Sequence, residues 1–262
     1  MERIQSSDGT PIAFDRSGEG PPVILVPGLF QHRAIDSGTA ELASLLAPRF
    51  TVFHYDRRGR GDSGDTQPYA VVREVEDLAA LIDEAGGSVA LFGMSSGGAL
   101  ALEAAARGLA VTRLAVYEPP FTDDDGNVDL SDDLTHGLAE RLEAGRPGDA
   151  VAFFMASSGV PEEAVAQMRQ APFWAGLESV AHTMPYDMAL MGDATLLSER
   201  APTVTVPTLV LDGGASEPWG RRSADAVAAA VPGAERRTLE GQTHEVASAP
   251  LAPVLAEFFG GA

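Results

Sequence analysis

Apolar residues follow two alternating patterns along residues 1–120. Short continuous apolar runs predict buried strands, which we expect at residues 22–27, 50–56, 88–93 and 112–120. Between these runs the apolar residues recur at helical spacing, and the predicted helices span residues 39–47, 72–86 and 96–108. Buried strands that alternate with helices predict an α/β fold, with a mostly parallel, doubly wound sheet covered on both faces.

The pattern changes after Pro120. Residues 121–200 contain no convincing strand; they begin with an acidic stretch, TDDDGNVDLSDD, and continue as short helices rich in Met and aromatic residues. The strand–helix alternation resumes at residues 206–214. We therefore predict one α/β core made of residues 1–120 and 201–262, with residues 121–200 inserted into it as an all-helical cap.

The composition excludes several kinds of chemistry. The 262 residues include no cysteine, which rules out disulfides, thiolate nucleophiles and cysteine-ligated zinc. The formal net charge is −20, and all 18 basic residues are arginines. Such an acidic chain is poorly suited to nucleic acid or an anionic membrane, because both are recognised through basic patches.

The N-terminal segment carries charges within its first three residues and has no apolar run before Pro21. This pattern lacks the apolar stretch of an export signal, and the apolar run at residues 23–30 is too short to span a membrane. We expect a soluble, cytoplasmic protein that acts on a small molecule. Whether it forms a homo-oligomer is left open.

The decapeptide LFGMSSGGAL contains the motif G-x-S-x-G between a predicted strand and a predicted helix. A serine at such a turn has strained backbone, and only glycine two residues before and after it avoids a Cβ clash. Centring the motif on Ser95 puts Gly93 and Gly97 at the crowded positions. Centring it on Ser96 would put Met94 at one of them. Ser95 is therefore the candidate nucleophile, and the backbone N–H of Ser96 points where a tetrahedral oxyanion would form.

A serine hydroxyl needs a neighbouring base to act as a nucleophile, and the chain offers five histidines. His244 lies in the loop between the last predicted strand and the final helix. Parallel strands have their exit loops at one edge of the sheet, so this loop can face the Ser95 turn. His54 lies within a predicted strand. The remaining histidines lie in a loop or in the predicted cap, where such residues are usually exposed: His32, His136 and His182. We predict His244 as the base.

This order of strand, G-x-S-x-G turn, helical insertion and late histidine resembles the α/β-hydrolase family, in its serine-nucleophile branch with a helical cap. The segment LVPGLF is similar to the family's oxyanion-loop segment, and YDRRGRGDSG to its polar loop after the fourth strand. The resemblance covers the chain outside the predicted cap. It implies that Ser95 is the nucleophile and His244 the general base and later general acid. It also implies an oxyanion hole made by the backbone N–H groups of Leu29 and Ser96, with no cofactor and no metal.

The acidic partner of the histidine departs from the family's usual pattern. That pattern places a carboxylate in the loop after the strand at 206–214, about three residues beyond Gly213, and this chain has Ser216 there. Asp212 and Glu217 are nearby substitutes. We prefer Glu118, which ends the strand after the predicted nucleophile helix, because relatives of haloalkane dehalogenases and a fungal lactonase supply their acid from that strand. Two prolines follow it and stiffen the backbone.

A pocket between cap and sheet would draw its walls from apolar residues at the strand exits and in the cap. The candidates are Leu29, Phe30, Met94, Phe121, Phe153, Met155, Phe173, Trp174, Met184 and Trp219. Among these we single out Phe30, Met94, Trp174 and Trp219. Such walls suit a mainly apolar substrate of medium size. We expect the charged residues of the polar loop at 55–64 to form turns and salt links.

The combined features predict a serine hydrolase that cleaves a carboxylic ester or lactone through an acyl-enzyme intermediate. Two alternatives remain. A carbon–carbon bond hydrolase uses the same three groups. A ligand-binding or cofactor-free, non-hydrolytic protein can have the same fold, because fold does not fix function.

Overall fold

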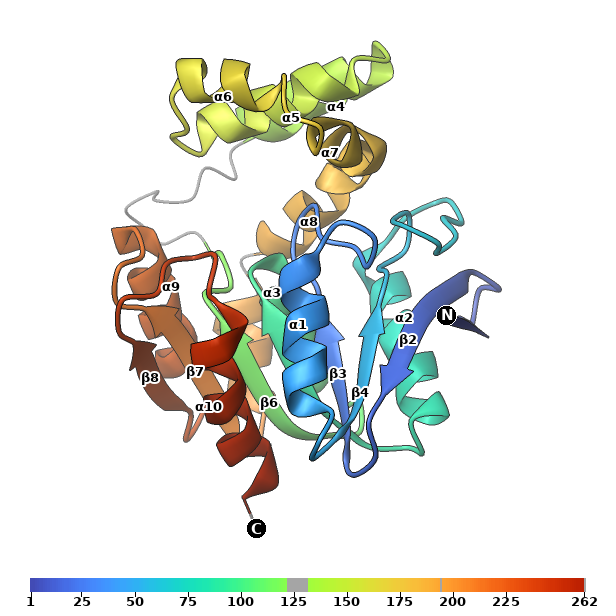
Figure 1. Ribbon diagram of the computed structural model, residues 1–262, viewed down its shortest axis with the longest axis vertical. Helices are drawn as coiled ribbons and strands as arrows, with labels where there is room; N and C mark the ends of the chain where they lie inside the picture. The colour runs from blue at the N-terminus through green and yellow to red at the C-terminus, as the bar shows by residue number, and fades with distance from the viewer. Residues whose placement is uncertain (122–131, 194, 262) are drawn as a thin grey trace.

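The computed structural model describes residues 1–121, 132–193 and 195–261. Eight strands form one sheet in the spatial order β1-β2-β4-β3-β5-β6-β7-β8 (Figure 1). Their bounds are β1 (Glu2–Gln5), β2 (Pro11–Ser17), β3 (Pro22–Val26), β4 (Thr51–Tyr55), β5 (Val89–Met94), β6 (Val111–Tyr117), β7 (Thr208–Gly213) and β8 (Glu235–Leu239). β2 pairs antiparallel with β1 and β4, and every other pair is parallel. The predicted mostly parallel sheet is confirmed.

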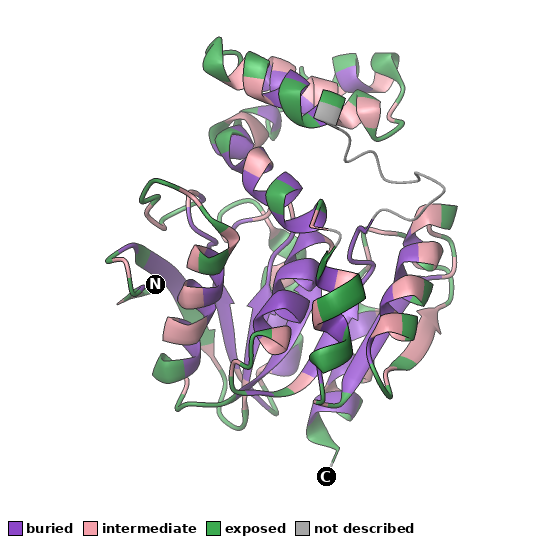
Figure 2. Ribbon diagram, turned by 180° about the vertical axis from the view of Figure 1, so that it is seen from behind, coloured by how far each residue is buried: buried purple, intermediate pink, exposed green. Residues whose placement is uncertain are grey.

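Helices cover both faces of this sheet. Their bounds are α1 (Ser37–Leu46), α2 (Val71–Glu84), α3 (Ser96–Ala106), α9 (Pro218–Ala230) and α10 (Ser248–Gly260). α1 and α10 pack on the face that carries Val23 and Leu25 of β3, whereas α2, α3 and α9 cover the face that carries Ile24 and Val26. Successive strand residues point to opposite faces, so a strand covered on both faces is apolar throughout. Figure 2 shows these central strands as buried.

The segment between β6 and β7 is helical over most of its described length. It contains α4 (Asp132–Glu143), α5 (Pro147–Ser157), α6 (Glu162–Met168), α7 (Trp174–Val180), η1 (Ala181–Thr183), α8 (Met184–Met191), η2 (Leu196–Arg200) and η3 (Ala201–Thr203). Figure 1 shows α4 to α8 above the edge toward which the parallel strands point, with α8 nearest the sheet. α8 packs against α3 of the core. Residues 122–131 and 194 of the predicted cap, including most of its acidic stretch, lie outside the described residues.

The α4–α8 segment has its own small apolar interior, separate from the two clusters that flank the sheet. Buried residues of this interior include Leu138, Val151, Trp174, Met184 and Met188. The Met and aromatic residues that mark this part of the sequence therefore pack largely against one another. No helix in the described part of the chain combines the length and apolar composition needed to cross a membrane.

Candidate active site

The turn between β5 and α3 holds Ser95 in a strained conformation. Its φ is +53° and its ψ is −129°, a backbone conformation that residues other than glycine rarely adopt. A Cβ on Gly93 would lie 2.3 Å from the carbonyl oxygen of Gly97. A Cβ on Gly97 would lie 2.2 Å from the carbonyl oxygen of Val26. Both approaches are too close for real atoms, so the turn requires glycine on each side of Ser95.

The two adjacent serines face in different directions. Ser95 is partly exposed and lines a cavity. Ser96 is fully buried, and its Oγ accepts a 3.4 Å hydrogen bond from Nη1 of Arg57. Of this pair, Ser95 is the one whose hydroxyl a small molecule in the cavity can reach.

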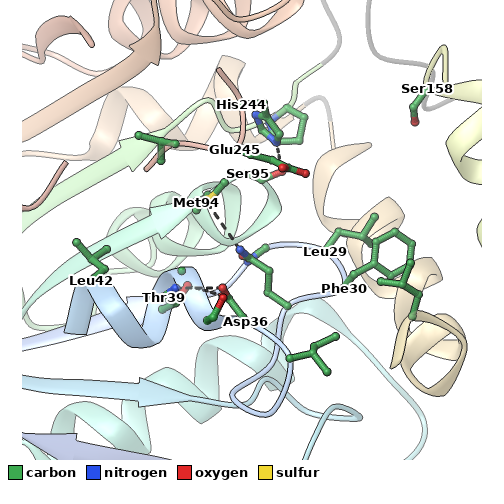
Figure 3. A pocket seen from close by; sticks show the side chains of 18 of the residues that line it. Leu29, Phe30, Asp36, Thr39, Leu42, Met94, Ser95, Ser158, His244 and Glu245 are labelled. Atoms are coloured by element: carbon green, nitrogen blue, oxygen red, sulfur yellow. Dashed lines mark hydrogen bonds between the residues drawn. The ribbon is translucent and has the colours of Figure 1, made fainter. Parts of the chain in front are cut away.

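His244 lies beside Ser95, in the loop between β8 and α10. Its Nε2 is 3.1 Å from the Ser95 Oγ, and its Nδ1 is 2.8 Å from Oε2 of Glu118. A ring with its proton on Nδ1 donates to the carboxylate and leaves Nε2 to accept the serine hydroxyl. The loop is held in place because the Tyr117 hydroxyl donates to the carbonyl of Thr243 at 2.6 Å. Figure 3 shows the contact between Ser95 and His244, both of which line the cavity.

Glu118 is fully buried at the end of β6, with a positive φ of +41°. The backbone N–H of Gly213 donates to its Oε1 at 2.8 Å. Burial opposes the ionisation of Glu118, but the hydrogen bonds from His244 and Gly213 outweigh it and hold the pKa of the carboxyl below its ordinary value. The first turn of α9 approaches so closely that a Cβ on Gly220 would lie 2.7 Å from this carboxylate. Glu118 is therefore a fixed, charged partner for the imidazole.

Asp212 and Glu217, the alternatives to Glu118 as the acid, have other surroundings. Asp212 is fully buried and accepts hydrogen bonds from Arg236 and Thr238, each at 2.7 Å. Glu217 is exposed and precedes the first residue of α9. Among the described residues, the carboxylate that contacts His244 is that of Glu118. Both β6 and β7 end at the same edge of the sheet, which is why the sequence leaves all three residues open.

The loop after β3 brings Leu29 to the cavity. Gly28 runs directly against the serine turn: a Cβ there would lie 2.9 Å from the carbonyl oxygen of Met94 and 3.1 Å from Cβ of Ser95. The loop is closed by the Gly28 N–H, which donates to Oε1 of Gln31 at 2.5 Å. Leu29 is thus adjacent to Ser95, and its predicted role as an N–H donor stays a prediction.

The cavity beside Ser95 has a volume of about 700 Å³. Leu29, Phe30, Met94 and Trp219 line it, and the Trp219 ring meets the His244 ring edge-on at 4.7 Å. Other lining residues come from the α4–α8 segment (Phe154, Ser157, Ser158, Leu177 and Met191) and from the α1–α10 side (Asp36, Thr39, Leu42, Phe92, Val246 and Leu251). In Figure 3, Leu29 and Phe30 lie to one side of Ser95, and Thr39 and Leu42 to the other. The cavity therefore has room on both sides of the serine.

Trp174 corrects our expectation about the wall. The structure places it in the interior of the α4–α8 segment, where it is 4% exposed and its Nε1 donates to Glu178 at 3.1 Å. Other expected wall residues also lie outside the lining: Phe121, Phe153, Met155, Phe173 and Met184. Phe153, Met155 and Met184 pack in or against the interior of the α4–α8 segment. Phe121 is buried in the apolar cluster beside the sheet, and Phe173 is exposed. Phe154, Leu177 and Met191 line the cavity but were not predicted, because their helical spacing does not distinguish them from residues packed inside the segment.

The remaining histidines are apart from this arrangement. His32 and His54 are buried, whereas His136 and His182 are exposed. Within residues 1–121, 132–193 and 195–261, no group of three or more acidic or histidine side chains is arranged to bind a metal ion.

Comparison with known proteins agrees with this architecture. Residues 23–257 match the model of the Alpha/beta hydrolase family. No curated protein matches the sequence. An alpha/beta hydrolase from Sphaerobacter thermophilus is 57% identical, with a TM-score of 0.91, over 98% of this chain and 100% of that chain.

More distant solved structures have the same fold. The enol-lactonase from Burkholderia xenovorans is 21% identical with a TM-score of 0.73, over 99% of this chain and 100% of that chain. A thermophilic esterase from Thermogutta terrifontis is 25% identical with a TM-score of 0.70, over 97% of this chain and 94% of that chain. With a family match along most of its length and a relative this similar, the chain belongs to the alpha/beta hydrolase family.

Proposed function

We propose that this protein is a serine hydrolase that cleaves a carboxylic ester or a lactone through an acyl-enzyme intermediate. One observation carries the proposal: hydrogen bonds join the Ser95 hydroxyl, the His244 ring and the Glu118 carboxylate in one line that opens into the cavity. Membership of the family supports a hydrolase. A lactonase and an esterase among the solved structures of this fold support the ester class.

Acylation begins when the Ser95 oxygen attacks the carbonyl carbon. Nε2 of His244 takes the serine proton, and the Glu118 carboxylate stabilises the resulting imidazolium. The carbonyl oxygen becomes an oxyanion, which the backbone N–H groups of Leu29 and Ser96 stabilise; a donor of this kind contributes about 10²–10³ in turnover. The tetrahedral intermediate then collapses, and the imidazolium gives its proton to the departing alkoxide oxygen.

Deacylation repeats these steps with water. His244 removes a proton from a water molecule as its oxygen attacks the acyl carbon on Ser95. The second tetrahedral intermediate expels the Ser95 oxygen, which regains its proton from the imidazolium. In a lactone the alcohol and acid are parts of one molecule, so a single ring-opened hydroxy acid is released.

The cavity supports a mainly apolar substrate of medium size. Its volume of about 700 Å³ lies within the range of small-molecule sites. Phe30, Trp219 and Phe154 present aromatic or apolar surface, and lining on both sides of Ser95 can hold an acyl and an alcohol portion separately.

The proposal is tested by measuring hydrolysis of nitrophenyl esters with acyl chains of graded length and of lactones of graded ring size. We expect turnover on part of this panel, and Ser95→Ala should reduce it by about 10⁴-fold or more. Ser44→Ala is the matched control, because Ser44 is exposed on α1 and its Oγ bonds to its own helix.

Three outcomes would contradict the proposed ester hydrolysis. Equal turnover in wild type and Ser95→Ala would show that another group carries the reaction. Ser95-dependent cleavage of a carbon–carbon bond without ester turnover would replace the ester class. Tight ligand binding without Ser95-dependent turnover on any ester or lactone would identify a non-hydrolytic member of the fold.

A further inference from the structure

The loop after β4 carries three buried arginines. Arg57, Arg58 and Arg60 are each at most 1% exposed. A guanidinium remains charged when buried, so each one needs carboxylates and other acceptors around it. The acceptors divide the three arginines into two sets with different positions in the molecule.

Arg58 is held by α2. Its Nε and Nη2 donate to the two carboxylate oxygens of Asp77 at 2.8 and 2.7 Å. Further hydrogen bonds reach Asp8 and the carbonyl of Arg73, each at 3.0 Å. None of these partners is among the described residues that line the cavity.

Arg57 and Arg60 instead share Asp187, which lies on α8. Nη1 of Arg57 donates to Oδ1 of Asp187 at 2.7 Å, and Nη2 of Arg60 donates to its Oδ2. Glu74 accepts two further hydrogen bonds from Arg57, at 2.6 and 2.7 Å. Two cations and two carboxylates thus balance, and Asp187 itself is fully buried. Buried charge therefore joins α8 to the core.

The same two arginines hold the loop that precedes Leu29. Nη1 of Arg60 donates to the carbonyl of Gly28 at 2.6 Å, and Nη1 of Arg57 contacts the carbonyl of Pro27 at 3.4 Å. The Gly28 carbonyl and the Leu29 N–H belong to one planar trans peptide unit, so they point in opposite directions. A guanidinium that fixes this carbonyl on the buried side fixes the Leu29 N–H on the other side, and Leu29 lines the cavity.

We propose that Asp187 is a positioning residue for the oxyanion-binding loop and acts through Arg60 and Arg57. The inference rests on the proposed function, because the Leu29 N–H matters to catalysis only when an oxyanion forms beside Ser95. Docking of α8 on the core and orientation of this donor are then one structural event.

The carboxylate partners of these arginines, one on α8 and one on α2, offer a matched pair of variants. Asp187→Asn and Asp77→Asn each remove the charge of a buried carboxylate that holds a buried arginine. Of the two, it is Asp187 that holds the arginines whose guanidinium groups contact the carbonyls of Gly28 and Pro27. We expect the kcat of Ser95-dependent ester hydrolysis to fall about 10²-fold in Asp187→Asn. It should stay near the wild-type value in Asp77→Asn, with both variants assayed below their unfolding temperatures.

Two readouts separate positioning from a loosened fold. A misplaced Leu29 N–H should lower kcat by the same factor for acetate esters and for esters of longer acyl chains. A displaced cavity wall should lower the hydrolysis of the longer esters most. Amide hydrogen exchange at residues 28–31 should become faster in Asp187→Asn and remain unchanged in Asp77→Asn. This second readout needs no catalytic activity.

If Asp187→Asn does not fold, Thr183→Val takes its place. This variant removes the 3.1 Å hydrogen bond from Nε of Arg60 and leaves every charge in position. We expect a smaller decrease in kcat and faster amide exchange at residues 28–31. Equal loss of turnover in Asp187→Asn and Asp77→Asn, or unchanged exchange at residues 28–31, would overturn the proposal. Should the wild type show no Ser95-dependent hydrolysis, the proposed function fails, and the exchange comparison still decides whether Asp187 orders this loop.

Discussion

The sheet with its flanking helices and the α4–α8 segment contribute different things to the cavity. Among the described residues, the non-glycine residues with positive φ are Phe30, Ser95 and Glu118, and all three follow strands of the sheet. The α4–α8 segment contributes mainly apolar surface, including Phe154, Leu177 and Met191. Strained backbone of this kind persists only where the surrounding structure fixes it. The backbone that carries Ser95 and Glu118 of the proposed mechanism is therefore fixed by the sheet, whereas the shape of the cavity depends also on the α4–α8 segment.

Among the three comparisons below, the largest decrease in kcat should follow removal of the charge of Glu118, at the end of β6. Glu118→Gln keeps the shape of the side chain but removes the charge that stabilises the imidazolium, so we expect kcat of ester hydrolysis to fall by about 10⁴-fold. Asp212→Asn is the control, because Asp212 is equally buried but bonds to Arg236 and Thr238. Near-normal turnover in Glu118→Gln, with loss in Asp212→Asn, would reverse the assignment of the acid.

A change in the α4–α8 segment should act on binding and leave the chemistry intact. Phe154 lines the cavity and meets Phe30 edge-on at 5.9 Å. Phe154→Ala should raise KM for apolar esters about tenfold through lost apolar contact, with little change in kcat. Phe173→Ala, at a 49% exposed position of the same segment outside the lining, should change neither constant. A loss confined to kcat in Phe154→Ala would contradict this division of roles.

The smallest effect concerns a buried histidine of the sheet and appears only on acidification. Burial lowers the pKa of His54 from its ordinary value of 6.5, although Asp36 and Asp56 oppose the shift. The unfolded chain therefore binds a proton that the folded chain does not, and stability decreases as the pH falls from 6.5 toward the lower folded pKa. The slope is at most about 1.4 kcal/mol per pH unit.

This slope can be measured by urea unfolding at pH 7.5, 6.5 and 5.5. His54→Gln removes the titrating group, so the pH dependence of its unfolding free energy should be weaker than that of wild type. Ser44→Ala, which removes no titrating group from the exposed face of α1, should keep the wild-type slope. Identical slopes in all three proteins would show that His54 is not held neutral.

The local sequence pattern was sufficient to predict the class of the fold and to choose Ser95 over Ser96 as the central serine of the G-x-S-x-G motif. Continuous apolar runs identify strands covered on both faces, as in β3. The requirement for glycine at position 93 is local, because a Cβ there would meet the carbonyl oxygen of Gly97, which is close in sequence. At Gly97 the Cβ would meet the carbonyl oxygen of Val26 in β3, far away in the sequence, so this clash arises only in the folded sheet. The strand and Gly93 inferences rest on short-range sterics and burial, which a sequence expresses directly.

Contacts between distant parts of the chain needed the tertiary structure. The sequence left Glu118, Asp212 and Glu217 open, and packing alone put Glu118 beside a histidine 126 positions later. The sequence pattern predicted Trp174 in the cavity wall, whereas the packing of α4 to α8 buries that ring. The link between Arg60 and Asp187 spans 127 positions. Side-chain type and spacing determine what a residue can contact, but only the relative placement of whole elements decides which contact forms.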